Sequence, residues 1–203
     1  MMAGVKRSTA IRHLVEMAAG ATDLLRLRDS DIGWPLEELW VTGDLLDTAD
    51  ELEVGSVILV LDVAPADLPW LALHPTGEWV GQQLRLGKRP MQWCYRPLEW
   101  PPWNPRHRRA TSIWTATGGL DEPTIERLRS GRDLDIVEPD NDDLRSQLTH
   151  ERHISHAHLR TIVDGYWEPQ RRRRHPSDEA EDHLWRAAAA LIEIDDALEE
   201  LDS

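Results

Sequence analysis

Cationic and aromatic side chains concentrate in one segment of the chain, between Arg85 and Trp114. Its cations are Arg85, Lys88, Arg89, Arg96, Arg106, Arg108 and Arg109. Its aromatic residues are Trp93, Tyr95, Trp100, Trp103 and Trp114. The one acid is Glu99, so the segment sums to +6 (seven minus one) in a chain of net charge −14, and the remainder sums to −20. Guanidinium groups bind carboxylates and phosphates through paired hydrogen bonds, and indole faces stack on bases or sugars. The segment is typical of a surface that binds an anion.

We therefore predict a ligand site in this segment, together with the turn at Gly43 and Asp44. The predicted members from the segment are Lys88, Arg89, Arg96, Trp100, Trp103, Arg106, Arg108 and Arg109. The ligand would be an anionic molecule, a nucleic acid or a protein partner, because Trp and Arg are enriched at interface hot spots. The competing interpretation is that the cations pair with some of the chain's 37 acids while the tryptophans fill the core. The sequence leaves both open.

Composition limits the class of protein. The 203 residues are 40% hydrophobic and 30% charged, which favours a folded, soluble protein. We expect a cytoplasmic location and no membrane partner, because no apolar run approaches the ~20 residues of a membrane-spanning helix and no signal-peptide core is visible. Cys94 is the single cysteine, so an intrachain disulfide is excluded. The net negative charge disfavours nonspecific coating of nucleic acid.

Hydrophobic periodicity predicts an α/β fold, with α+β as the alternative. The expected form is a mixed sheet with a central buried strand covered by helices, followed by a C-terminal helical segment. Residues 56–63 are apolar without alternation, which indicates a strand buried on both faces. Helices are predicted at 8–27, 76–86, 121–128, 142–166 and 177–201, and further strands at 39–42, 91–95, 111–117 and 134–137.

Two parts of the chain differ in character. Residues 1–138 form the predicted α/β domain, and residues 139–203 form a helical segment that either packs on it or mediates oligomerisation. The last helix has a heptad-like seam of Leu184, Ala187, Leu191, Ile194, Leu198 and Leu201. A protein partner or a second copy would bind through Leu184, Leu191 and Leu198. Packing within the chain is the alternative, and it is the one that we favour.

Histidines recur in the first long C-terminal helix, at His150, His153, His156 and His158. Steps of three residues rotate successive side chains by about 60° around a helix, so at most two of the first three would share a metal ion. Solvated or capping histidines explain the pattern more simply, and we predict no metal site. The sequence also has no Gly-rich phosphate loop and no nucleophile elbow. Catalytic residues are unknown at this stage.

The order helix, strand ending in glycine, buried strand, helix, strand over residues 8–96 resembles the minimal nucleotidyltransferase domain. The resemblance implies that Gly43 would contact nucleotide phosphates, but Asp44 stands where that family has serine. The family's two magnesium-binding aspartates would fall at residues 55–57, which read Gly-Ser-Val. An enzyme of this kind would need magnesium held by displaced carboxylates. The available ones are Asp44, Asp47, Asp50 and Asp62.

Nearly the whole chain also resembles an uncharacterised group of proteins from GC-rich bacteria. The resemblance is carried by residues 32–43 (IGWPLEELWVTG), 70–75 (WLALHP) and 182–187 (DHLWRA). It implies no activity. The sequence therefore predicts a non-catalytic intracellular binding or interaction protein without a cofactor. The alternatives are a magnesium-dependent nucleotidyltransferase and a structural subunit of an oligomer.

Overall fold

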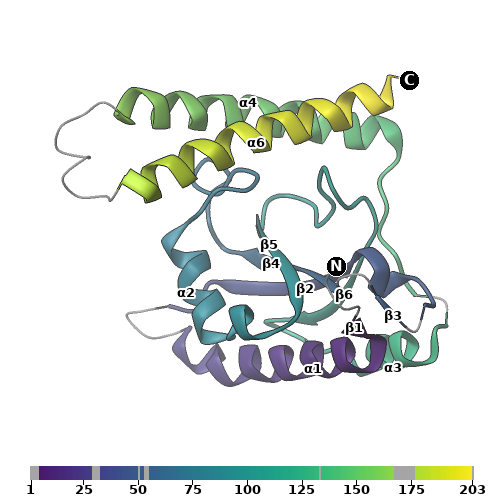
Figure 1. Ribbon diagram of the computed structural model, residues 1–203. Coiled ribbons are helices and arrows are strands. Elements are labelled where there is room, and N and C mark those ends of the chain that lie inside the picture. Colours follow the sequence, from purple (N-terminus) through teal and green to yellow (C-terminus); the bar gives the residue numbers. More distant parts are fainter. Residues whose placement is uncertain are drawn as a thin grey trace.

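The computed structural model describes residues 5–28, 33–49, 51–52, 55–132, 134–166 and 177–202. Its helices are α1 (Arg7–Leu24), α2 (Pro75–Gln83), α3 (Glu122–Ser130), α4 (Asn141–Tyr166) and α6 (Ser177–Leu201), with 3₁₀ turns η1 (Leu25–Leu27), η2 (Gly43–Leu46) and η3 (Leu86–Lys88). Its strands are β1 (Val5–Lys6), β2 (Leu36–Thr42), β3 (Glu51–Leu52), β4 (Gly55–Leu61), β5 (Met91–Pro97), β6 (Ala110–Thr115) and β7 (Gly119–Leu120). Figure 1 shows α1 and α3 on one side of the sheet and the antiparallel pair α4 and α6 on the other.

The main sheet has five strands in the order β5-β4-β2-β6-β7. Strand β2 pairs antiparallel with both β4 and β6, whereas β4 and β5 are parallel and are connected through α2. All seven residues of β4 are buried, as their continuous apolar run predicted. The α/β class and the mixed sheet are confirmed, although β2 rather than β4 occupies the middle of the sheet.

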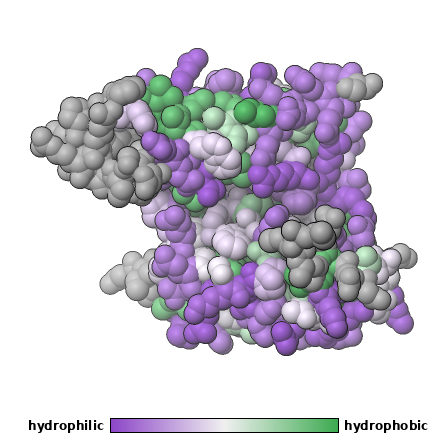
Figure 2. Space-filling view, in the orientation of Figure 1, coloured by the Kyte–Doolittle hydropathy of each residue, from purple (hydrophilic) through white to green (hydrophobic). Residues whose placement is uncertain are grey.

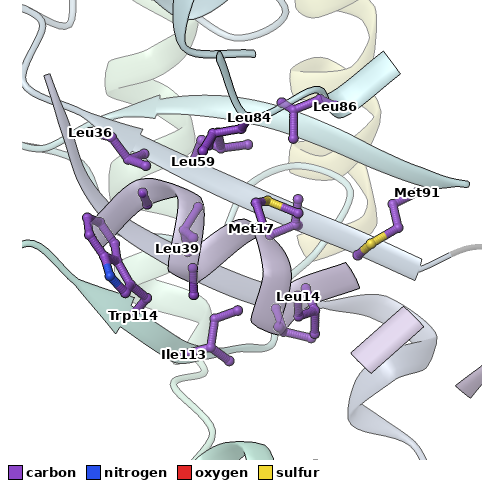
Figure 3. Packing of buried hydrophobic residues seen from close by; sticks show 14 of the residues in the cluster. Leu14, Met17, Leu36, Leu39, Leu59, Leu84, Leu86, Met91, Ile113 and Trp114 are labelled. Carbon is purple, nitrogen blue, oxygen red and sulfur yellow. The ribbon is translucent and has the colours of Figure 1, made fainter. Parts of the chain in front are cut away.

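Helix α1 packs its apolar stripe on the sheet. The buried positions recur every three or four residues, which places them on one helical face: Ala10, Ile11, Leu14, Met17, Ala18 and Ala21. Figure 3 shows Leu14 and Met17 on the helix beside residues of the strands, among them Leu39 and Ile113. The Trp114 indole also donates a hydrogen bond of 2.9 Å to the Thr22 hydroxyl. Helix and sheet therefore share the larger core.

Helices α4 and α6 form a hairpin that is tied to the rest of the chain by a second core. Ion pairs join Arg152 to Asp195 at 2.7 Å and Arg145 to Asp202, so the helices run antiparallel. The second core combines loop and helix residues: Trp70, Trp103, Leu144, Leu148, Ala190, Ile194 and Ala197. Because its two tryptophans come from loops of the α/β part, the hairpin packs on that part of the chain.

Most predicted elements have a counterpart within a few residues, and the bounds of α6 agree with the prediction. The predicted edge strand at 134–137 is wrong, because only Val137 forms a bridge, with Ala110. Before the bridge, the Asp135 carbonyl accepts a hydrogen bond from the Thr111 hydroxyl, and Pro139 after it has no N–H to donate. Among the described helices, none has the length and apolar character needed to cross a membrane.

Candidate functional site

Arg96, a predicted ligand residue, is an internal structural group. Its side chain is fully buried, and its two terminal nitrogens donate hydrogen bonds of 2.8 and 2.7 Å to the two carboxylate oxygens of Glu151 in α4. Its Nε donates to the Pro101 carbonyl at 3.1 Å. The expectation that Arg96 lies on an accessible surface is therefore wrong, because a carboxylate from a distant helix neutralises it inside the protein.

Two of the predicted stacking residues are also inside the protein. Trp100 and Trp103 are 6% and 7% exposed. The Arg96 guanidinium lies 5.0 Å from the centre of the Trp100 ring, and Trp103 belongs to the second core. The expectation that these indoles form part of an accessible patch is wrong, since the hairpin covers them.

The other predicted cations, apart from Lys88, form ion pairs with acids of the chain. The pairs are Arg89 with Glu16 (2.9 Å), Arg106 with Glu193 (2.5 Å), Arg108 with Glu200 (2.8 Å), and Arg109 with Asp47 (3.7 Å) and Glu138 (3.8 Å). Arg106 also stacks on Trp70, whose indole donates to the same Glu193 at 2.8 Å. These residues therefore follow the competing interpretation, in which the cations pair with acids of the same chain.

Gly43 and Asp44 lie at the turn that follows β2, beside the start of β4. Gly43 has φ +66°, and a Cβ there would lie 3.5 Å from the His107 ring. Burial lowers the pKa of His107, as does the nearby Arg106, whereas Asp44 acts in the opposite direction. The positive φ explains why glycine is favoured at the first position of the turn, since residues with a Cβ rarely adopt it.

Of the carboxylates that the enzyme alternative requires, Asp44 and Asp47 lie at this turn, where Asp47 forms an ion pair with Arg109, and Asp62 does not. The register pairs Thr42 with Ser56 and Leu36 with Leu61, so Asp44 and Asp62 lie near opposite ends of β4. A strand of that length separates them by about 20 Å, far more than a shared magnesium ion allows. Asp50 lies outside the described residues. Within the described part of the chain, no three His, Cys, Asp or Glu side chains are placed to hold a metal ion.

The leucine seam of α6 contributes to packing within the chain. Leu191 is buried, and Leu198 packs against the second core, while Leu184 is half-buried. The large apolar side chains that α6 exposes are instead Trp185 and Ile192, at 66% and 60%. Figure 2 shows hydrophobic residues over α4 and α6, on a face that is otherwise mainly hydrophilic.

A pocket of about 800 Å³ lies beside β5. Its lining comes from the loop after β4, from α2 and η3, from β5, and from Arg106 and Arg186. The lining residues are Leu71, Ala72, Leu73, Glu78, Gly81, Gln82, Arg85, Leu86, Gly87, Lys88, Met91, Gln92, Trp93, Cys94, Tyr95, Arg106 and Arg186. We call it the β5 groove. Of the predicted site residues, it contains Lys88 and Arg106.

The β5 groove is cationic at its rim. Its lining includes four cations and one carboxylate, Glu78. Arg106 and Arg186 are paired with Glu193 and Asp182. Arg85 and Lys88 are exposed, and no carboxylate of the described residues forms an ion pair with either. Trp93 beside them is 40% exposed. These three side chains can therefore contact a ligand without breaking an internal ion pair.

Backbone strain is concentrated at the same groove. Among the described residues, Leu71 and Arg85 are the two non-glycine residues with positive φ, at 58° and 53°, and both line it. A left-handed conformation costs a residue with a Cβ roughly 1–2 kcal/mol, and such residues cluster at binding and active sites. The strain is a second feature, independent of charge, that marks the β5 groove.

Tyr95 and Cys94 supply neutral groups to the groove. Burial raises the pKa of the Tyr95 hydroxyl to about 12, against a hydrogen bond with the Trp93 side chain. Burial also raises the pKa of the Cys94 thiol to about 12, with Arg96 and Arg106 acting in the opposite direction. Both groups are protonated at neutral pH, so Cys94 is not an activated nucleophile.

Comparison with known proteins places the chain in a family. Residues 5–200 match the family described as Domain of unknown function (DUF7711). The chain belongs to this family. No curated protein and no solved structure matches it. The family match includes both the α/β part and the helical hairpin, so the whole lining of the β5 groove lies inside the DUF7711 domain.

Three charged or aromatic groove residues were absent from the predicted site although they lie in the cationic segment: Arg85, Trp93 and Tyr95. The sequence could have indicated them, because the predicted strand 91–95, which contains Trp93 and Tyr95, follows soon after Arg85 and Lys88. Arg186 had no sequence signal, since only the packing of α6 brings it to the groove. For this member of the family, the arrangement offers charge, an aromatic face and neutral hydrogen-bonding groups to a bound molecule.

Proposed function

We propose that the chain is a non-catalytic binding protein of the cytoplasm that takes an anionic ligand in the β5 groove. The observation that carries this proposal is the pair of exposed cations, Arg85 and Lys88, beside the exposed Trp93. Arg85 and Lys88 face the groove, and no acid of the described residues forms an ion pair with either, so a carboxylate or phosphate from outside can bind them. A charge-assisted hydrogen bond of this kind contributes about 1.5–3 kcal/mol.

The net charge of the protein explains why the site would be selective. A body of charge −14 repels anions beyond a Debye length of about 8–10 Å at ordinary salt. An anion therefore has to fit the groove closely to reach Arg85 and Lys88. The exposed face of Trp93 adds a surface on which a planar or apolar part of the ligand can lie.

Intrinsic tryptophan fluorescence can report binding, because Trp93 lines the groove and is exposed. We would titrate pyrophosphate, ADP and blocked hexaglutamate, and expect quenching with at least one of them. The variant Arg85→Glu/Lys88→Glu should weaken that binding at least about tenfold, since two favourable contacts become repulsive. The matched control is Arg127→Glu/Arg132→Glu, which makes the same charge change near α3, beside the opposite edge of the sheet.

Assigning the signal requires a second pair of variants. Trp93→Leu should abolish the fluorescence change, and Trp185→Leu on the outer side of α6 should preserve it. Equal affinity in the wild type and in Arg85→Glu/Lys88→Glu would refute the proposal, as would the absence of binding by all three anions. Reversing Arg106 would be a poorer test, because its ion pair with Glu193 holds the hairpin.

A further inference from the structure

Strand β5 forms one edge of the main sheet, and this edge follows the groove. Among the described strands, β5 pairs with β4 alone. Five consecutive residues of β5, 91–95, line the groove. Successive side chains of a strand point to opposite faces of the sheet, so a pocket lined by both Trp93 and Cys94 must extend around the strand edge. The backbone N–H and C=O groups along such an edge can pair with an added strand.

The groove has a wall on each side of this edge. Helix α2 contributes Gly81 and Gln82 to one wall, together with Arg85 just before η3, and the hairpin side contributes Arg186. Gly81 has no side chain, and the Tyr95 hydroxyl fills the space beside it. Five strand residues extend about 17 Å, enough for an extended peptide of similar length. The shape therefore favours a chain-like ligand that lies along β5.

The charges of the walls indicate which peptide fits. Side chains of an added strand would alternate between the wall with Arg85 and Lys88 and the wall with Arg186 and Arg106. Cations face both sets of side chains, and Glu78 is the one carboxylate in the lining. Arg186 and Arg106 already have Asp182 and Glu193 as partners, so Arg85 and Lys88 supply the charge that attracts acidic side chains. We infer that the β5 groove binds an acidic peptide in extended conformation, which adds to β5 as a sixth strand of the sheet. This inference depends on the proposed function and identifies its ligand class.

Blocked hexaglutamate and two N-methylated forms of it test strand addition directly. One form carries three N-methyl groups on alternate residues and the other carries them on three adjacent residues. An added strand bonds its neighbour through alternate residues, so the alternate form can direct every methyl group away from β5, whereas the adjacent form cannot. We expect the alternate form to bind like the parent peptide and the adjacent form to bind at least about tenfold more weakly. Hydrogen exchange of β5 amides should slow when hexaglutamate binds.

The outcomes separate this inference from the proposed function. Equal affinity of the two N-methylated forms, or unchanged exchange in β5, would overturn strand addition. Binding of ADP or a dT6 oligonucleotide that depends on Arg85 and Lys88, without binding of hexaglutamate, would overturn the peptide and leave an anion site in place. No binding by any of these anions would overturn both. Blocked hexalysine has the same length, and its binding with equal affinity would contradict the charge argument.

Discussion

The hydroxyl of Tyr95 occupies the space into which a side chain on Gly81 would project. A Cβ built on Gly81 lies 2.5 Å from that hydroxyl oxygen, and one built on Gly77, a helical turn earlier, lies 3.1 Å from the Tyr95 ring. The two glycines therefore allow the ring to lie directly against α2. This contact fixes α2 to β5 and shapes one wall of the β5 groove.

We predict that Gly81→Ala destabilises the protein. Inside a helix, alanine is normally more favourable than glycine by about 1 kcal/mol, so the expected loss is opposite to the helix propensity. The added methyl group forces the tyrosine to move, and overpacking of this kind typically costs about 1–3 kcal/mol. In a Tyr95→Phe background the nearest atoms are 3.4 Å or more from the new methyl group, so Gly81→Ala should become neutral or stabilising. Urea unfolding of the four proteins measures the effect.

Gly87→Ala is the matched control, since a Cβ there meets no atom within 4 Å. It should leave the free energy of unfolding nearly unchanged in both backgrounds. If Gly81→Ala were equally destabilising in the wild type and in the Tyr95→Phe background, the contact with the hydroxyl would not be the cause.

The buried pair of Arg96 and Glu151 should be costly to break from one side. Glu151→Gln leaves the fully buried guanidinium without its carboxylate, and we expect a loss of about 3–5 kcal/mol in the free energy of unfolding. The double variant Arg96→Met/Glu151→Met removes both charges and should recover at least half of that loss. A double-mutant cycle of Arg96→Met, Glu151→Met and the double variant, measured by urea unfolding, checks this, and additive losses would show that the two charges are not coupled.

The lowered pKa of His107 predicts a pH dependence of stability. Between its unfolded pKa of about 6.5 and the lower folded value, the unfolded chain binds a proton that the folded chain does not. The contribution of this histidine to stability is therefore fully present above its unfolded pKa of about 6.5, and it is lost as the pH falls toward the folded pKa. His107→Gln should flatten the slope of unfolding free energy between about pH 5 and pH 7. An unchanged slope in the variant would assign the pH dependence to other groups.

Cys94 should react slowly in the native protein. With a pKa of about 12, roughly one thiol in ten thousand is ionised at pH 8, against about a quarter for an unperturbed cysteine. Alkylation by iodoacetamide at pH 8 should therefore be roughly a thousandfold slower than in the urea-unfolded chain. The rate is followed by mass spectrometry. Native and unfolded rates within about tenfold of each other would contradict the raised pKa.

Local patterns were sufficient to predict most of the secondary structure. The apolar run of β4 and the spacing of apolar residues in α1 and α6 are properties of neighbouring residues. The burial of Arg96 and the pairing of Arg106 depend instead on acids 55 and 87 positions away. Those acids reach the cationic segment because the helical hairpin folds over it, and no local pattern specifies that packing. For this reason the predicted site contained several residues that the structure uses internally.

Part of the β5 groove could be predicted from the sequence. Lys88 was a predicted site residue, and Arg85 and Trp93 lie in the same cationic segment. Which cations of that segment would have no internal carboxylate could not be predicted, because this depends on the positions of Glu16, Glu193 and Glu200. The strain at Leu71 and Arg85 is likewise visible only in the folded backbone.

Locating bound anions by NMR tests the central claim most directly. Amide and indole shifts of the whole chain would be recorded while pyrophosphate, ADP and hexaglutamate are added in turn. The account predicts that the largest changes fall on Arg85, Lys88 and the Trp93 indole, and that they disappear in Arg85→Glu/Lys88→Glu. Changes confined to the turn at Gly43 or to Arg109, or no changes with any of the three anions, would contradict it.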